Sequence, residues 1–408
     1  MSATQSEETV SELGKKIAEL AKAFDNRCTM ESLEGTQGSS SETGSYHMSP
    51  RETLILLLNN MLDKVQGPTR TLIEMVNTAR VRLSVMRIII NFNLIANIPD
   101  SGSISFNKLA SIVGANRLEL ERVLRFAFSQ RIFQEKIPGS GEVSHTELSK
   151  AISALTPWIK LVLSPVTILP DLSLPEALES KNSSKAAAEL AFKKNFWRVL
   201  KSNSKFGEFQ DGLRSLSIAQ KACLDPVGDL FRWEEQAKAL IIDLGGGDGY
   251  SAIEGARKNP HLHFIVQDLE ENRIRAEQNI PQDLKNRVIF QAHDFFTPQR
   301  QIIRHPVTIF MKSILHNWSN DRCVKILRQL LPLLTQEGSR LLVQEYLLSD
   351  CAHVRAMDVT MLTLLNSGER TIFDFEALFH EVDKRMRIVK VWDSEEWGTR
   401  ILEVTVDS

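Results

Sequence analysis

The periodicity of apolar residues changes near residue 239. Residues 51–98 carry apolar side chains at helical spacing, more densely than a helix with one face in water requires, and residues 156–235 are again typical of helices. From residue 239 onward short β-rich runs alternate with helical stretches; the runs are ALIIDLG, HFIVQDL, VIFQAHD, VTIFMKS and RLLVQEYLL. This alternation predicts an α/β domain with a doubly wound, mostly parallel sheet covered on both faces.

Both ends of the chain depart from this alternation. Residues 7–24 place apolar side chains on one face of an amphipathic helix, and residues 32–50 have the Ser-, Gly- and Thr-rich composition of a linker. The final segment, RIVKVWDSEEWGTRILEVTVD, has the pattern of a hairpin. We therefore expect antiparallel strands at one edge of the sheet.

Residues 83–150 have the element order of a winged helix. Two helical stretches, SFNKLASIVG and NRLELERVLRFAFSQRIFQEK, are joined at Gly114, and the Gly- and Pro-containing segment PGSGEVSHTELSKAI then indicates a tight hairpin. Eight Lys or Arg against six Asp or Glu, spread over both helices, do not form the basic stripe that phosphate contacts require. We expect this winged helix to serve packing and dimerisation, and we expect no nucleic-acid partner.

Composition narrows the class of protein further. The 408 residues, 42 % of them hydrophobic, are enough for two or three domains with sizeable cores, and the net charge of −2 favours neither nucleic acid nor an anionic membrane. Four cysteines without a CxxC pair argue against a disulfide framework and a structural zinc site. The polar N-terminus and apolar runs shorter than the roughly 20 residues of a membrane span predict a cytoplasmic protein without a membrane partner.

The segment LIIDLGGGDGYSA, residues 240–252, carries the strongest chemical signal. Four glycines in five positions follow a predicted strand, at the first strand-to-helix loop, where open parallel sheets bind ligands. Gly245 and Gly247 allow a tight turn and close backbone approach. Asp268, 23 residues after Gly245, ends the next strand, and an acidic group at about this spacing reaches a ribose diol. The loop predicts a nucleoside-bearing cofactor.

Dinucleotides and nucleoside triphosphates fit the loop less well. Tyr250 stands where the GxGxxG fingerprint requires its third glycine, which counts against a pyrophosphate, and no GxxxxGK[ST] loop occurs. Acidic residues end three successive predicted strands, and this repetition supports a ligand at that edge; the residues are Asp243, Asp268 and Asp294. For Asp294, a cap of the following turn is the alternative interpretation.

Six segments occur in an order that matches a known family; they are DLGGGDG, VQDLE, HDFF, FMKSILHNWSNDRCVKIL, VQEYLL and NSGERTIFDFEALF. Over roughly residues 70–405 the chain resembles the S-adenosylmethionine-dependent class I O-methyltransferases of the plant caffeic acid and fungal natural-product type. The resemblance implies a Rossmann-like methyltransferase domain, S-adenosyl-L-methionine as cofactor, a small-molecule substrate, no metal ion, and a homodimer.

The resemblance also assigns roles to cofactor-binding residues. It implies that Gly245 and Gly247 approach the methionine part of the cofactor, that Asp268 holds the ribose hydroxyls, and that Asp294 and Phe295 flank the adenine. It places Lys312 near the cofactor, for which an ordinary strand-end cation is the alternative. The cofactor-binding residues that we expect are Asp243, Gly245, Gly247, Asp268, Asp294, Phe295 and Lys312.

By the same resemblance His316 matches the catalytic base, and Glu345 and Glu369 match the acidic residues that orient it. A phenol with a pKa near 10 is mostly protonated at neutral pH, and a neutral imidazole takes its proton in the transition state, an effect worth roughly 10²- to 10⁴-fold. A carboxylate on the other ring nitrogen fixes the tautomer. Asn317 departs from the family, which commonly has an acid at this position. For Glu369, a surface charge paired with Arg370 is the alternative.

The expected division of the chain has four parts. Residues 1–50 form an N-terminal helix and flexible linker, 51–155 a winged-helix dimerisation domain, 156–235 a helical connector that roofs the substrate pocket, and 236–408 the cofactor-binding methyltransferase domain. The leading hypothesis is methylation of a hydroxyl on an aromatic or polyketide-like secondary metabolite. One alternative is a pericyclase or cyclase that keeps the cofactor without transferring its methyl group. The other alternative is a ligand-sensing winged-helix regulator.

Overall fold

The computed structural model of the chain describes residues 9–31, 50–179, 181, 184–202, 205–219, 240–299, 306–393 and 399–407. The chain divides into two compact units. The first unit comprises Met1–Leu20, Leu54–Ile168 and Leu200–Ala219, and the second unit comprises Ala21–Thr53, Leu169–Val199 and Gln220–Ser408.

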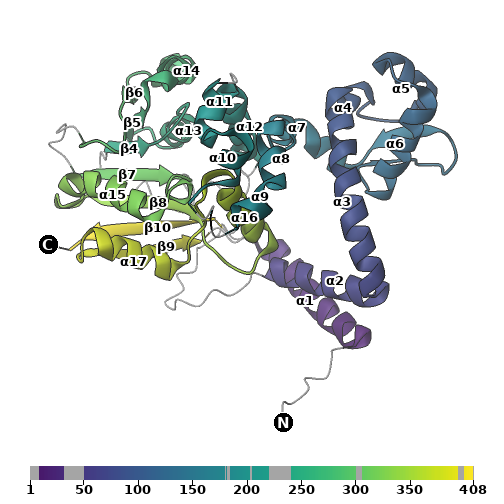
Figure 1. Cartoon of the computed structure of the whole chain (residues 1–408), viewed down its shortest axis with the longest axis horizontal. Helices are drawn as coiled ribbons and strands as arrows, with labels where there is room; N and C mark the ends of the chain where they lie inside the picture. Colours follow the sequence, from purple (N-terminus) through teal and green to yellow (C-terminus); the bar gives the residue numbers. More distant parts are fainter. Residues whose placement is uncertain are drawn as a thin grey trace, which may run out of the picture. The chain divides into compact units, whose positions relative to one another are not determined.

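A seven-stranded sheet forms the centre of the second unit as far as the structure describes it (Figure 1). Its strand order is β6-β5-β4-β7-β8-β10-β9, with parallel pairing from β6 to β8 and antiparallel pairing of β10 with β8 and β9. The strands are β4 (Leu240–Leu244), β5 (His263–Asp268), β6 (Val288–Ala292), β7 (Val307–Lys312), β8 (Arg340–Tyr346), β9 (Met386–Asp393) and β10 (Thr399–Val406). The predicted α/β class, the doubly wound sheet and the antiparallel hairpin at one edge are confirmed.

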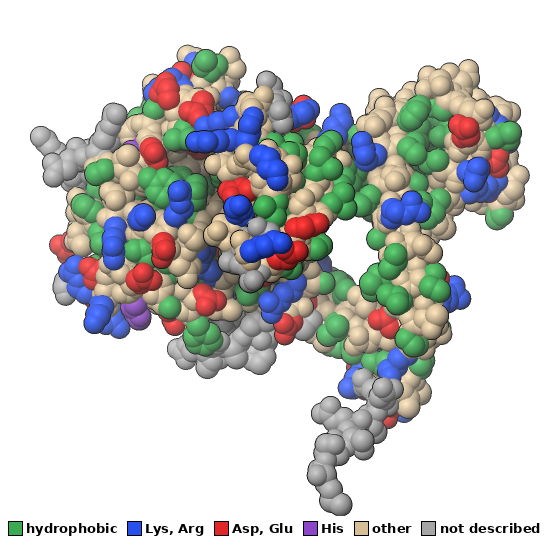
Figure 2. Space-filling model, viewed as in Figure 1, with side chains coloured by type: hydrophobic (Ala, Val, Ile, Leu, Met, Phe, Trp, Pro, Cys, Tyr) green, Lys and Arg blue, Asp and Glu red, His purple; other side chains and the backbone are tan. Residues whose placement is uncertain are grey.

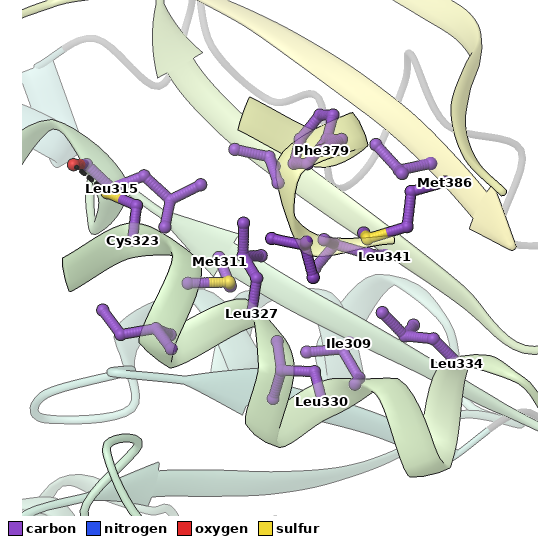
Figure 3. Packing of buried hydrophobic residues seen from close by; sticks show 14 of the residues in the cluster. Ile309, Met311, Leu315, Cys323, Leu327, Leu330, Leu334, Leu341, Phe379 and Met386 are labelled. Atoms are coloured by element: carbon purple, nitrogen blue, oxygen red, sulfur yellow. Dashed lines mark hydrogen bonds between the residues drawn. The ribbon is translucent and has the colours of Figure 1, made fainter. Parts of the chain in front are cut away.

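Alternation of side chains along the strands produces two apolar layers, one on each face of the sheet. On β4, Ile242 and Leu244 join the layer under α15 and α17, whereas Ile241 joins the opposite layer under α13 and α14. Figure 3 shows side chains of the first layer, with Met311 beside Leu327. The helices are α13 (Tyr250–Lys258), α14 (Arg273–Asn279), α15 (Asn320–Leu334) and α17 (Ile372–Val382).

Further helices precede the sheet or lie between its strands. Short 3₁₀ turns are η4 (Glu270–Asn272), η5 (Gln282–Leu284) and η6 (Leu315–Asn317), and the remaining helices are α8 (Pro165–Leu172), α9 (Leu174–Ala177), α10 (Ala187–Phe192), α11 (Phe196–Ser202) and α16 (Ala352–Leu365). Within the second unit α10 packs on α16. Thr371 caps α17 through a capping box with Asp374, which fixes where the chain enters this helix.

The first unit contains the helix–helix–hairpin order expected for residues 83–150. Three short strands pair antiparallel in the order β1-β3-β2, and Gly114 ends α5 with a φ of 67°. Two helices belong to this unit in part, α1 (Val10–Glu31) and α2 (Pro50–Gln66). Its other elements are α3 (Pro68–Asn91), α4 (Leu94–Asn97), β1 (Ile104–Ser105), α5 (Phe106–Val113), α6 (Arg117–Ser129), β2 (Phe133–Gln134), β3 (Glu142–His145), α7 (Glu147–Val162) and α12 (Phe206–Ala219). The helix expected within residues 7–24 is present as α1, which extends to Glu31.

Two sequence predictions lie outside the described residues: the linker at 32–49 and the helical character of 220–235. In the described ranges no single helix has both the length and the apolar composition to cross a membrane; only α7 and α8 taken together, with a bend of 51° between them, satisfy that test.

Candidate active site

The glycine-rich loop lies where the order of the strands reverses. The chain passes from β4 outward to β5 and β6 and then returns to β7 on the other side of β4. Loops at the carboxyl ends of β4 and β7 therefore diverge at this point, which is the usual position of a ligand crevice in an open α/β sheet. The sequence prediction of the loop's position is confirmed.

Three glycines of the loop have backbone conformations that other residues rarely adopt. Gly245, Gly247 and Gly249 have φ angles of 73°, 57° and 79°. A Cβ at Gly245 would lie 2.5 Å from Cδ1 of Ile314, whereas a Cβ at Gly247 would have nothing within 4 Å. The backbone of Gly247 thus borders open space in which a ligand can approach it closely.

Asp268 holds the glycine loop from the end of β5. Its Oδ2 accepts a hydrogen bond from the backbone N–H of Gly247 at 2.8 Å, and its Oδ1 accepts from Leu269 N and from Asn272 Nδ2, each at 2.7 Å. Burial raises the pKa of Asp268, and these three donors oppose the shift. A carboxylate that already organises the loop is thereby fixed beside the space at Gly247.

Asp243 and Lys312 place opposite charges at the ends of β4 and β7. Asp243 is 2 % exposed, and its Oδ2 has no hydrogen bond to a described residue. Burial raises its pKa to about 7, although the charge of Lys312 opposes the shift. Burial lowers the pKa of Lys312, which forms no ion pair or hydrogen bond with a described residue. A buried carboxylate oxygen without a partner is costly, so a polar ligand at this position would satisfy it.

Asp294 and Phe295 follow β6 in a tight turn. Oδ1 of Asp294 accepts a hydrogen bond from Phe296 N at 3.0 Å, so this side chain caps the turn, as the alternative interpretation holds. Phe295 packs edge-on against Phe296 and Trp318, with ring centroids 5.1 and 6.1 Å apart. A Cβ at Gly245 would lie 3.7 Å from Phe295, so this ring borders the glycine loop.

His316, Glu345 and Glu369 come together although 53 residues separate the first from the last. His316 lies in η6, Glu345 in β8, and Glu369 just before α17. Nδ1 of His316 is 2.8 Å from Oε1 of Glu369 and 3.5 Å from Oε2 of Glu345, and all three residues are buried. Nε2 of His316 has no hydrogen bond to a described residue. Glu369 is therefore not the surface partner of Arg370.

Glu345 also organises the backbone that carries His316. Its Oε1 accepts hydrogen bonds from the backbone N–H groups of Ile314, Leu315 and His316, at 3.0, 2.7 and 3.4 Å. Because these donors lie at the start of η6, the carboxylate satisfies groups that a turn leaves unpaired. One side chain thus fixes both the turn and the charge beside the imidazole.

The two carboxylates decide the protonation of His316. Burial by itself lowers the pKa of this imidazole, but the charge of Glu345 and the hydrogen bond to Glu369 outweigh it and raise the pKa to about 9. Burial also raises the pKa of Glu345, which the positive charge of His316 opposes. With Nδ1 held by Glu369, the proton that a reaction adds or removes is the one on Nε2.

The sequence analysis did not predict Asp358 at this site, and it named Arg370 only as a surface partner of Glu369. Oδ1 of Asp358, on α16, accepts a hydrogen bond from Glu369 N at 2.9 Å, and the guanidinium of Arg370 contacts the segment that carries His316. In the sequence motif Glu369-Arg370-Thr371, the family resemblance assigned a catalytic role to Glu369 only. Nothing in the spacing of Asp358 indicates that it faces a residue eleven positions further on.

The doubly wound sheet with a glycine loop at its reversal point defines a Rossmann-like fold, and the buried histidine–carboxylate cluster lies on segments of the same unit. A family model described as O-methyltransferase domain matches residues 189–383. The O-methyltransferase CTB2 of Cercospora beticola is 30 % identical over 391 residues, covering 88 % of this chain and 82 % of that protein. The chain belongs to the family of S-adenosylmethionine-dependent class I O-methyltransferases, and the expected class, cofactor and enzymatic activity are confirmed.

Solved structures share the fold. OxaC, in complex with sinefungin and meleagrin, matches with a TM-score of 0.75 at 19 % identity over 98 % of this chain and 99 % of its own. A protein described as a pericyclic reaction enzyme matches with a TM-score of 0.70 at 19 % identity over 96 % of this chain and 100 % of its own.

Proposed function

We propose that the chain methylates a hydroxyl of an aromatic or polyketide-like secondary metabolite, with His316 as the general base. The observation that supports the proposal is the fixed imidazole: Glu369 holds Nδ1 at 2.8 Å, while Nε2 has no hydrogen bond to a described residue. S-adenosylmethionine supplies an electrophilic methyl group when bound. This chain's residues then have to align the acceptor oxygen and take its proton, and a fixed Nε2 serves both needs.

Incubation of the purified protein with methyl-labelled S-adenosylmethionine and a panel of phenols and polyketide precursors tests this proposal. We expect label in an ether product of at least one phenol, together with the demethylated cofactor. Label on carbon or nitrogen only, in every accepted compound, would contradict the assignment of an oxygen acceptor.

We propose further that the loop and the strand ends hold the cofactor. Three features support contacts to the amino-acid part, with Gly245 beside it: Oδ2 of Asp243 and Lys312, neither of which has a hydrogen bond to a described residue, and the open space at Gly247. Asp268 would receive the ribose hydroxyls on its remaining lone pairs. Phe295, with the turn that Asp294 caps, would border the adenine.

Replacing Asp268 by asparagine is expected to weaken binding of S-adenosylhomocysteine about 10- to 100-fold, because neutral acceptors form weaker hydrogen bonds than carboxylates. Isothermal titration calorimetry measures the change. Asp283→Asn, at an exposed carboxylate in η5, is the matched control and should bind as the parent does. Equal affinities for Asp268→Asn and the parent would remove Asp268 from the binding site.

A pericyclase is the second candidate function. A pKa of about 9 leaves His316 mostly protonated at neutral pH, and an imidazolium can polarise a substrate carbonyl by donating a hydrogen bond from Nε2. The fold match with a pericyclic reaction enzyme agrees with this possibility. A rearranged, unlabelled product in the labelling experiment would favour it. The hypothesis of a ligand-sensing winged-helix regulator has no support, because His316, Glu345 and Glu369 lie together and the chain belongs to an enzyme family.

We also propose that the protein is a homodimer, with 51–155 as its dimerisation domain, 156–235 as the connector over the substrate and 236–408 as the cofactor-binding domain. In the first unit, α2 has no buried residue, and Leu62 and Val65 are 52 % and 66 % exposed. Figure 2 shows apolar side chains along α3 as well. Large exposed apolar surface of this kind is typical of an interface.

Replacing both Leu62 and Val65 by aspartate is expected to convert dimer to monomer, because two carboxylates would have to be desolvated at the interface. Light scattering coupled to size-exclusion chromatography measures the mass. Asp63→Asn, between them on the same helix, is the control. A parent protein that is monomeric at high concentration would contradict the homodimer.

We propose a reducing, cytoplasmic location. The described cysteines Cys323 and Cys351 are free thiols, which supports it.

A further inference from the structure

Arg370 is a buried arginine whose hydrogen-bond partners lie on one short segment. It is 7 % exposed. Its Nη1 donates to Leu315 O at 2.9 Å, its Nη2 to Trp318 O at 2.7 Å, and its Nε and Nη2 to Oδ1 of Asn320 at 3.0 and 2.8 Å. Within the described ranges it forms no ion pair. Removing a guanidinium from water costs free energy, and the hydrogen bonds to this segment offset part of that cost. A buried charge that forms no ion pair with a described residue suggests that the arginine has a role beyond stability.

The partners of Arg370 surround His316 in sequence. Leu315 and Trp318 lie on either side of this residue, and η6 is a single turn. Glu345 accepts hydrogen bonds from backbone N–H groups at the start of the turn, and Arg370 donates to carbonyl groups within and after it. Two buried side chains of opposite charge type therefore hold the N–H groups at the start of η6 and the carbonyl groups within and after it.

The backbone of Arg370 is itself fixed. Leu348 N donates to Arg370 O at 2.9 Å, and Leu347, directly after β8, forms a parallel bridge with Arg370. Since Glu369 is the preceding residue, the same stretch of backbone holds the carboxylate on Nδ1 of His316 and the guanidinium on its turn. The positions of both groups relative to Glu345 are therefore set together.

We propose that Arg370 is a positioning residue: by donating hydrogen bonds to carbonyl groups of η6 and the residue after it, it fixes the imidazole of His316 relative to Glu369. The proposal rests on the proposed role of His316 as the base. Among the described residues, three charged groups face this imidazole: Glu345 from β8, and Glu369 and Arg370 from the segment before α17. Of these Arg370 alone lowers the pKa of His316, so its loss has a consequence that a purely structural residue would not have.

Three variants separate the effect of the hydrogen bonds that Arg370 donates from the effect of its positive charge on the pKa of His316. For Arg370→Gln we expect kcat to fall about 10- to 100-fold, since small misplacements of a catalytic group have effects of this size, and the midpoint of the pH profile of kcat to move to higher pH. Arg370→Lys should keep the midpoint near that of the parent but recover kcat only in part, because an ammonium lacks the planar fork. Asn320→Ala, at an exposed residue, should lower kcat about 2- to 5-fold.

Matched measurements exclude a general loss of structure. Arg328→Gln, at an exposed arginine of α15, should behave as the parent in kcat and pH profile. Affinity for S-adenosylhomocysteine should stay unchanged in all variants, because the glycine loop lies outside the contacts of Arg370. An unchanged kcat in both Arg370→Gln and Asn320→Ala would overturn the proposal, as would a fall in kcat without a shift of the pH midpoint.

The double variant His316→Ala/Arg370→Gln tests the role of His316 as the base separately from the positioning role of Arg370. If Arg370 acts through His316, the second substitution has little further effect on kcat once the imidazole is gone. A fully active His316→Ala protein would contradict the proposed base. An impaired His316→Ala protein that loses a further 10-fold or more in the double variant would contradict the role of Arg370 alone.

Discussion

Replacing His316 by alanine is expected to lower kcat for methyl transfer by about 10²- to 10⁴-fold, the range for removal of a general base. The Nδ1–Glu369 hydrogen bond of 2.8 Å orients the ring, so the variant loses both the imidazole and its fixed orientation. Methyl-labelled cofactor and single-turnover kinetics measure the chemical step directly.

His380→Ala is the matched control for this variant, because His380 is an exposed histidine in the last turn of α17. It should retain the parent kcat. Calorimetry with S-adenosylhomocysteine should give the same affinity for His316→Ala as for the parent, which shows that the cofactor site is intact. Transfer at the parent rate by His316→Ala would eliminate the base assignment.

Raising the pH from 7 to 9 is expected to increase kcat by about tenfold or more. A base must be neutral to accept a proton, and a group with a pKa of about 9 is neutral in only about 1 % of molecules at pH 7 but in half of them at pH 9. A pH profile of single-turnover rates measures this change. The His316→Ala protein serves as the control, since its residual rate should lack the step near pH 9.

Glu345→Gln is expected to move that step to lower pH, because it removes a negative charge that raises the pKa of His316.

The raised pKa of His316 also makes the stability of the folded protein depend on pH. The stabilisation from protonated His316 is complete below its ordinary pKa of 6.5 and is lost as the pH rises through about 9. Melting temperatures of the parent should therefore fall over this interval more than those of His316→Ala. A flat rate profile of the parent from pH 7 to 9 would contradict the expected step and its shift in Glu345→Gln, and equal slopes of melting temperature with pH in the parent and His316→Ala would contradict the effect on folding.

Much of the second unit follows from local sequence rules. Apolar runs of strand length, separated by amphipathic helices, define β4 to β8, and side-chain period 2 along β4 already divides Ile241 from Ile242 between the two layers. The glycines at 245 and 247 signal their own backbone requirement, since few other residues adopt those φ angles. Pro68 at the start of α3 and Gly114 at the end of α5 are similar local signals.

Distances between remote residues could not be read in the same way. The resemblance named His316, Glu345 and Glu369, but their contacts depend on how β8 packs beside the segment before α17. This packing decides the 2.8 Å distance from Nδ1 of His316 to Oε1 of Glu369, the burial of all three residues and the three backbone donors to Glu345. The raised pKa of His316 is a consequence of that meeting and has no counterpart in the sequence.

The sequence by itself determined the α/β class, the glycine loop and the residue types of the site, because these depend on periodicity and on the conformational limits of single residues. Only the tertiary structure decided which charges face His316 and that Arg370 grips its turn. Burial and hydrogen-bond geometry arise from segments that are distant along the chain, and their energies depend on which groups water no longer reaches.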